Sequence, residues 1–343
     1  MSSIPAPQAS LPLDSLKKLG DRAAGITARY GVFVALAVVV AFMSVKINGF
    51  FAWSTFMTIG LSGVEAGVLA AAFTVAMIAG RIDLAVGTLV GFLASIFGVL
   101  SLRGHLPIWA GALVIVGVAL AVALVHGFLT VNIGINAVIV TFATSQVLFG
   151  VGQWIQTRHA ATATGYVIPI PPSSWPFRLI TWTSTRWWSI PIPVWLMLGI
   201  YAALYVVMSH TRLGAHIYAV GANPDAAERA GIRVRMIWRL VFVLTAGASL
   251  LMVFFYLGRQ GSVTVGHGYG MEFDVLTAVL LGGASFAGGV GRVERTLVAV
   301  LLLYTLNFGM QTLQVDPNVT RMTKGGILLA AVALSGYVAK RRA

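Results

Sequence analysis

Two carboxylates stand where the sequence is otherwise apolar. Glu65 lies in the middle of a long apolar run, and Asp83 follows Gly80 at the start of another. A charge at the centre of a membrane costs about 2.5 to 3.5 kcal/mol on insertion scales, so carboxylates in such runs are functional candidates. Two interpretations stay open for each. Glu65 either acts within a bundle or accepts a hydrogen bond from Ser or Thr, and Asp83 either caps the following helix at the membrane interface or works as a gate.

His267, Glu272 and Asp274 form the one cluster of a histidine with carboxylates along the chain. Metal sites have tighter and more fixed ligand spacing, whereas this stretch is rich in glycine, which favours a flexible connection. An enzyme would need a clustered acid, base or metal site, and no other group of residues comes near one. We therefore predict neither a metal site nor catalytic residues.

Neutral polar side chains recur at helical spacing on two further runs. The first face holds Gln146, Gly150 and Gln153, and the second holds Tyr304, Asn307 and Gln311. These faces either hydrogen-bond the hydroxyl groups of a neutral solute or join packed helices to one another.

The composition places these residues in a membrane. The 343 residues are 58% hydrophobic and 10% charged, against about 25% charged in soluble domains, and an apolar span needs about 20 residues. We predict an all-α membrane protein, a polytopic bundle of about ten transmembrane helices. The predicted spans are 30–46, 55–79, 83–101, 107–130, 136–156, 191–208, 237–257, 273–289, 296–313 and 323–339.

The charges set the expected orientation. The chain has 23 Lys and Arg against 10 Asp and Glu, a formal charge of +13, which in so apolar a chain indicates the cytoplasmic excess of basic residues rather than nucleic-acid binding. Cytoplasmic N and C termini put 15 of the 23 basic residues inside. The absence of cysteine excludes disulfides and thiolate chemistry.

The expected organisation follows from these spans. Residues 1–29 form a cytoplasmic leader, 30–339 the transmembrane domain and 340–343 a cytoplasmic tail. No cleavage site follows the first apolar run, so it is a retained span rather than a signal peptide. Within the domain, 157–190 is a periplasmic loop rich in Trp and Pro, and 209–236 is a cytoplasmic loop.

The cytoplasmic loop contains the signals of a short helix. Asn223 is a good N-cap, Pro224 suits the first helical position, Asp225 complements the positive helix end, and Gly231 suits the C-terminal cap. A helix of about seven residues is marginal in water and must lean on something. It either lies against its own bundle and the headgroups or docks a cytoplasmic partner.

Four ordered motifs resemble those of one family. They are GRIDLAVG at 80–87, TRLGAHIYAVGANP at 211–224 continuing to Ile232, LGGASFAGGVG at 281–291, and the tail around 307–309 and 324–326. Together they resemble ribose-type sugar permeases of ATP-binding-cassette (ABC) importers, over roughly residues 50 to 340. Arg81, Ala85 and the charged run 292–295 depart from that family's usual residues, which bears on the intracellular gate and on the sugar.

The resemblance implies one half of a pore in the bacterial inner membrane, in contact with membrane lipid. Its partners would be an ABC ATPase, a periplasmic sugar-binding protein, and a second copy or a related permease. The short helix would couple to the ATPase through Gly221, Asn223, Pro224, Asp225, Glu228, Arg229 and Gly231. The candidates for the path or gate are Glu65, Asp83, Gln146, Gln153, Asn307 and Gln311.

ATP and magnesium are expected on the separate ATPase and no cofactor on this chain. None of the five lysines precedes Ser or Thr, so the phosphate-binding loop of an ATPase is missing. The absence of charge on the two polar faces favours a neutral polyol over a zwitterion. The alternatives are a permease for branched-chain amino acids or nucleosides and, further off, a secondary transporter.

Overall fold

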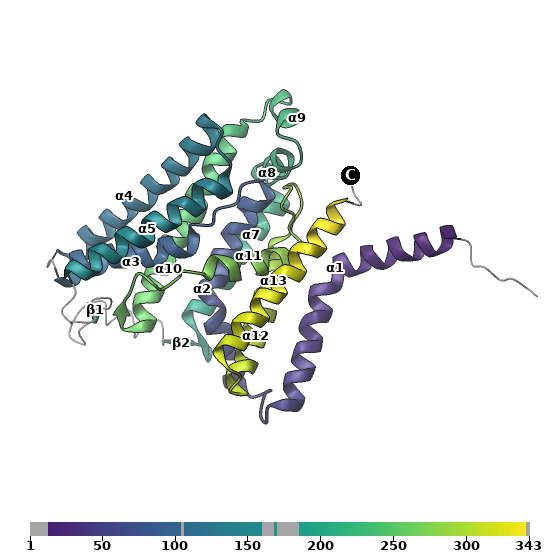
Figure 1. The fold of residues 1–343 in the computed structure, drawn as a ribbon, viewed down its shortest axis with the longest axis horizontal. Helices are drawn as coiled ribbons and strands as arrows, with labels where there is room; N and C mark the ends of the chain where they lie inside the picture. Colours follow the sequence, from purple (N-terminus) through teal and green to yellow (C-terminus); the bar gives the residue numbers. More distant parts are fainter. Residues whose placement is uncertain (1–12, 104–105, 160–167, 170–184, 341–343) are drawn as a thin grey trace, which may run out of the picture.

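The computed structural model describes residues 13–103, 106–159, 168–169 and 185–340, which form a bundle of helices (Figure 1). In chain order the helices are α1 (Leu13–Lys46), α2 (Trp53–Ile78), α3 (Val86–Phe97), η1 (Gly98–Arg103), α4 (Ile108–Gly127), η2 (Phe128–Ile133), α5 (Ala137–His159), α7 (Ile192–His210), α8 (Arg212–Ala222), α9 (Pro224–Arg229), α10 (Val234–Gln260), α11 (Met271–Leu281), α12 (Val293–Thr312) and α13 (Pro317–Lys340). η1 and η2 are short π-helices that continue α3 and α4.

The described residues contain four two-residue strands. β1 (Ile168–Pro169) pairs antiparallel with β4 (Ser262–Val263), and β2 (Arg186–Trp187) pairs antiparallel with β3 (Ile190–Pro191). In Figure 1 these strands lie away from α9, which stands at the far end of the bundle. We call these two ends of the bundle the strand end and the α9 end.

Helix α2 is the centre of the bundle. In its most apolar window 89% of the residues are buried, and it packs against α7, α10, α11 and α12. Its glycines bring neighbours close: a Cβ on Gly63 would touch Tyr304, and a Cβ on Gly67 would overlap Met197. A helix that is apolar on all sides and rich in small residues is suited to this central place.

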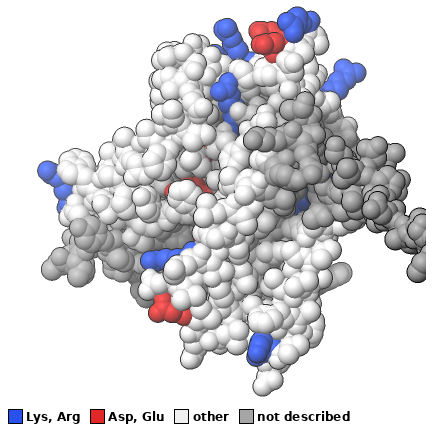
Figure 2. Space-filling model, turned by 45° about the vertical axis from the view of Figure 1, so that its right-hand side comes forward, with Lys and Arg blue, Asp and Glu red and all other residues white. Residues whose placement is uncertain are grey.

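Helices α4 and α5 form an apolar exterior. Only 22% and 28% of their most apolar windows are buried, although these windows carry the hydropathy of membrane spans. Large apolar side chains such as Leu120 and Trp154 are exposed on them. Figure 2 shows most charged side chains towards the ends of the molecule, with a broad band of other residues between them. This surface is suited to contact with lipid acyl chains.

The described residues contain six helices long and apolar enough to cross a membrane. They are α2, α4 with η2, α5, α7, α10 and α12. Two shorter apolar helices, Tyr30–Lys46 and Val86–Ser101, coincide with the predicted spans 30–46 and 83–101. The all-α membrane class is therefore confirmed, while the count of about ten and the side of the termini stay predictions.

The predicted span 273–289 is wrong in its second half. Helix α11 has 11 residues and ends at Leu281, and a glycine-rich loop follows. Gly283, Gly288 and Gly289 have φ angles of +87°, +81° and +70°, which a right-handed helix excludes. At about 1.5 Å per residue, α11 covers only about half of the hydrocarbon thickness.

The helices do not begin and end at the predicted boundaries near residue 29 and around the loop 209–236. Helix α1 begins at Leu13 and continues through the expected boundary at residues 29 and 30. Within the predicted loop 209–236, the structure adds the helix α8, and α10 begins already at Val234. Residues 1–12, 160–167, 170–184 and 341–343 of the predicted leader, periplasmic loop and tail lie outside the described residues.

Candidate functional site

The predicted short helix is present as α9. The Asn223 side chain caps it, because its Oδ1 accepts from the backbone N–H of Ala226 at 3.0 Å. Gly231 has the left-handed φ of +82° expected after the helix. Ala227 is buried, while Asp225, Glu228 and Arg229 are exposed. The helix thus rests on the bundle through one face and presents charged side chains on the other.

Helix α8, which the sequence patterns did not reveal, places Gly221 inside the bundle. The Thr211 side chain caps α8 by accepting from the N–H of Gly214 at 3.3 Å. Gly221 is buried, and a Cβ there would overlap the carbonyl oxygen of Ile78. Gly221 therefore permits a backbone contact within this chain, whereas the exposed residues of α9 are the ones that can meet a partner.

Three segments distant in sequence meet beneath α9, at the points where their glycine motifs lie. The N–H of Gly289 donates to the carbonyl of Ile78 at 2.8 Å, and the Tyr218 hydroxyl donates to the carbonyl of Gly291 at 2.8 Å. A Cβ on Gly288 would lie only 3.0 Å from the Cα of Gly80. We call this contact, formed by residues 78–81, 218–222 and 288–291, the glycine junction.

Trp238 joins the junction to α10. Its indole N–H donates to the carbonyl of Ala79 at 3.0 Å, and the guanidinium of Arg81 lies 3.7 Å from the centre of its ring. An arginine over a tryptophan face is attracted by the ring quadrupole. Arg81, a departure from the family pattern, therefore has a structural partner in this chain.

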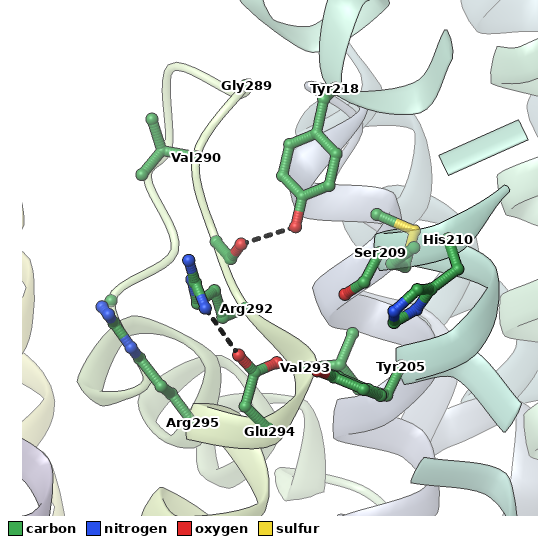
Figure 3. A pocket seen from close by; sticks show the side chains of 13 residues that line it. Tyr205, Ser209, His210, Tyr218, Gly289, Val290, Arg292, Val293, Glu294 and Arg295 are labelled. Carbon is green, nitrogen blue, oxygen red and sulfur yellow. Dashed lines mark hydrogen bonds and ion pairs between the residues drawn. The ribbon is translucent and has the colours of Figure 1, made fainter. Parts of the chain in front are cut away.

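A pocket of about 510 Å³ opens beside the junction (Figure 3). Tyr205, Ser209 and His210 line one side of it, and Arg292 and Glu294 pair at 3.2 Å on the other. Burial, together with the nearby Glu294 carboxylate, raises the pKa of the Tyr218 hydroxyl above its ordinary value. Tyr218 therefore stays protonated at neutral pH and keeps its hydrogen bond to Gly291.

Glu65 lies in the bundle with a histidine as its partner. The residue is 6% exposed, and its Oε2 lies 2.7 Å from Nε2 of His267. The His267 ring stacks on Tyr256, with 3.6 Å between ring centres. The partner of Glu65 is thus a histidine from another part of the chain, and not the Ser or Thr of one of the two interpretations.

The side chains of His267, Glu272 and Asp274, which are neighbours in sequence, have separate partners. Glu272 accepts from the N–H of Gly270 at 3.1 Å, and Asp274 pairs with Lys324 at 2.7 Å. Among the described residues no group of three His, Asp or Glu side chains is placed to hold a metal. His267 and Asp274 thus find their partners on other helices, whereas Glu272 finds its partner within the same stretch.

Asp83 is buried and makes more contacts than a helix cap would. It is 3% exposed, and the choice between a cap and a gate stays a prediction. Its Oδ1 accepts from the N–H of Ala85 at 3.1 Å, one residue before α3. Its Oδ2 accepts from the Thr245 hydroxyl at 2.5 Å, and Nδ1 of His126 lies 3.8 Å from Oδ1.

The predicted polar faces are only partly exposed. Gln146 and Gln311 are exposed, while Gln153 and Asn307 are half-buried. Gln311 donates to Oδ1 of Asn307 at 3.4 Å, a bond within one helix. These contacts leave the solute and packing interpretations of both faces untested.

Sequence reasoning missed Gln156, which is fully buried on α5. Its Oε1 accepts from the N–H of Val265 at 3.0 Å, and its Nε2 has no hydrogen-bond partner. Its spacing of three residues after Gln153 is a helical signal that could have identified it. Thr245 and His126 carried no comparable signal, because their roles depend on contacts with distant segments.

The comparisons with known proteins agree with this arrangement. Residues 55–332 match the family described as branched-chain amino acid transport system / permease component. The ribose import permease protein RbsC of Escherichia coli strain K12 is 31% identical over 87% of this chain and 91% of its own length.

Two further relatives from the same organism carry other sugars in their names. The D-allose transport system permease protein AlsC is 28% identical over 91% of this chain and 93% of its own length. The L-arabinose transport system permease protein AraH is 26% identical over 92% of both chains. No solved structure matches this chain.

The family match covers most of the chain, including all three segments of the glycine junction, from Ile78 to Gly291. Six long apolar helices in the described residues fit a protein that crosses the inner membrane several times. The chain therefore belongs to the transport-system permease family, as a multi-pass inner-membrane transport component and not an enzyme.

Proposed function

We propose that the chain is the permease subunit of an ABC importer for a sugar or a similar neutral polyhydroxylated solute. The relatives named for ribose, arabinose and allose support the sugar. The family description names branched-chain amino acids, but these three relatives do not favour that alternative. The chain would supply half of a pore, completed by a second copy or a related permease.

The proposed partners are a separate ATPase at the α9 end and a periplasmic sugar-binding protein at the strand end. This orientation makes the α9 end, with both termini, cytoplasmic. The exposed charges of α9, in particular Asp225, Glu228 and Arg229, support a protein contact there. ATP and magnesium would be bound by the ATPase.

The glycine junction is the observation that carries the mechanism. A partner that moves α9 also moves α8, whose Gly221 rests on the last turn of α2 and on Gly289. The end of α2 is thus joined to the loop before α12 by a backbone hydrogen bond and to the start of α10 by the Trp238 side chain. Closure of two ATPases would move these helix ends together and switch access to the pore from the periplasm to the cytoplasm.

The test is a charge reversal on the exposed face of α9, in the complete complex reconstituted into vesicles. Glu228→Arg should lower sugar uptake about tenfold or more, while the permease stays folded and the sugar-binding protein keeps its affinity. ATP hydrolysis should lose its dependence on the loaded binding protein, because the contact that couples them is altered.

Lys46→Glu is the matched control, since Lys46 is an exposed charge at the end of α1, far from α9. It should leave uptake and ATP hydrolysis unchanged. Normal coupled uptake by the Glu228→Arg complex would overturn the coupling role of α9. Failure of the unaltered complex to import any sugar would instead overturn the proposed solute class.

A further inference from the structure

The connection between α10 and α11, residues 261–270, does not stay at the surface of the bundle. It runs along α3, and three glycines of α3 and its continuation mark its course. A Cβ on Gly98 would press on the side chain of Val263, one on Gly91 would overlap the carbonyls of Val265 and His267, and one on Gly87 would overlap the carbonyl of Gly268. From Gly98 to Gly87, the helix extends about 16 Å at 1.5 Å per residue.

The depth of this segment agrees with its other contacts. Tyr269 contacts Phe149 with 4.5 Å between ring centres, and Phe149 lies in the middle of α5. His267 meets Glu65, which lies in the middle of the 26-residue α2. Residues 261–270 thus enter from the strand end to about half of the hydrocarbon thickness of about 30 Å, where α11 begins. We call them the re-entrant segment.

Backbone without helical hydrogen bonds is costly at this depth. The N–H of Val265 donates to Gln156, and that of Thr264 donates to the Tyr256 hydroxyl at 3.0 Å. Even so, Gly266 is exposed and the Tyr269 side chain is 48% exposed. Irregular backbone does not face lipid within the hydrocarbon region and is found where it is covered by protein or lines a water-filled cavity. The exposed side of this segment therefore faces either another protein chain or a water-filled space.

His267 is the group on this segment best fitted to bind a solute. Its side chain is 16% exposed, whereas that of Glu65 beside it is 8% exposed. Glu65 and the Tyr256 ring hold the imidazole from two sides, so little side-chain entropy remains to be lost on binding. The neighbouring Gln156 keeps a buried amide nitrogen without a partner. A fixed, partly exposed imidazole suits a hydroxyl of a neutral solute.

We propose that the re-entrant segment forms a wall of the translocation path, with His267 hydrogen-bonding the solute and Tyr269 beside it. The identity of the solute as a sugar rests on the proposed function, whereas the exposure of the segment to an aqueous path does not. Glu65 acts here as a positioning residue that holds the imidazole.

The absence of cysteine from the chain gives a direct test of the path. Gly266→Cys and Tyr269→Cys are treated in native membranes with a membrane-impermeant, water-soluble maleimide. The Gly266 variant is well tolerated sterically, because a Cβ there meets only Thr264 Oγ1 at 3.7 Å. Leu120→Cys is the control, since Leu120 is 46% exposed in the middle of the lipid-facing span of α4 and η2.

Both path variants should react at least tenfold faster than Leu120→Cys, and an excess of the transported sugar should slow their reaction. Path cysteines as unreactive as Leu120→Cys would overturn the proposal whatever the solute is. Fast labelling without protection by any sugar would retain the aqueous path but remove the solute contact.

Uptake by the reconstituted complex tests His267 itself. His267→Phe should raise the KM for uptake about tenfold, and His267→Gln, which keeps hydrogen-bonding groups, should recover most of that loss. Unchanged KM in both variants would overturn the solute contact. If the unaltered complex imports no sugar, the proposed function fails, and the labelling result still decides the path.

Discussion

Two histidine–carboxylate pairs lie inside this bundle, and they differ in how far their side chains are exposed and in how closely their atoms approach. In the pair of Glu65 with His267, Oε2 and Nε2 are 2.7 Å apart, and the His267 side chain is 16% exposed. In the pair of Asp83 with His126 the atoms are 3.8 Å apart, and the side chains are 5% and 2% exposed. The first pair is short and open on one side, whereas the second is looser and enclosed.

The remaining contacts explain this difference. Asp83 accepts from Thr245 of α10 and from the N–H of Ala85, and His126 of α4 lies beside it. It therefore ties α10 and α4 to the break before α3, near the glycine junction. Glu65 instead holds the imidazole of His267, which belongs to the re-entrant segment. An enclosed carboxylate that satisfies several donors stabilises the fold, while an open pair is available to a solute.

Removal of the enclosed carboxylate should have the largest effect. Asp83→Ala leaves the Ala85 N–H without its acceptor, while the Thr245 hydroxyl keeps only the carbonyl of Phe242 at 3.0 Å. An unsatisfied buried donor costs about 1 to 3 kcal/mol. We expect a loss of about 1 to 3 kcal/mol in stability, measured as a lower midpoint of thermal unfolding in detergent. Asp83→Asn, which keeps an acceptor, should lose less. An unfolding midpoint for Asp83→Ala equal to that of the unaltered chain would refute the structural role.

Neutralising the open carboxylate should separate function from stability. Glu65→Gln keeps the shape and an acceptor for His267 but removes the charge that orients the imidazole. We expect sugar uptake to fall about tenfold, equivalent to about 1.4 kcal/mol, with the unfolding midpoint nearly unchanged. The comparison of the two pairs would be reversed if Glu65→Gln unfolded early while its uptake per folded complex stayed normal.

The smallest effects should come from the hydrogen bonds beside each pair. Thr245→Val removes the bond to Asp83, and Tyr256→Phe removes the bond from the N–H of Thr264. Each should cost about 1 kcal/mol of stability. Only Tyr256→Phe should also change uptake, by about twofold, because the lost hydroxyl holds Thr264 in the re-entrant segment that carries His267. Both variants are measured by thermal unfolding and by uptake. Equal uptake defects in the two variants would contradict the different roles assigned to the two pairs.

Local features of the fold were predictable because their physics is local. Asn223, Pro224 and Gly231 determine where α9 begins and ends through bonds within a few residues. The expected extent of the span after Phe273 failed, since the apolar character of residues 282–289 conceals the left-handed glycines that follow α11. Helix α8 was missed because its sequence carries polar and apolar residues without an evident stop before Asn223.

Of the candidate site, the sequence predicted the two carboxylates but not their partners, because those partners lie far away along the chain. Glu65 and Asp83 stood out by charge in apolar runs, but their partners did not. The sequence by itself determined that this chain crosses a membrane, where its basic residues gather and which carboxylates need partners, because composition and short spacing report the cost of burying polar groups. Only the tertiary structure decided that Glu65 meets His267, 202 positions away, and that Asp83 meets Thr245, 162 positions away. These contacts depend on how non-helical segments pass between helices, which a local sequence pattern does not predict.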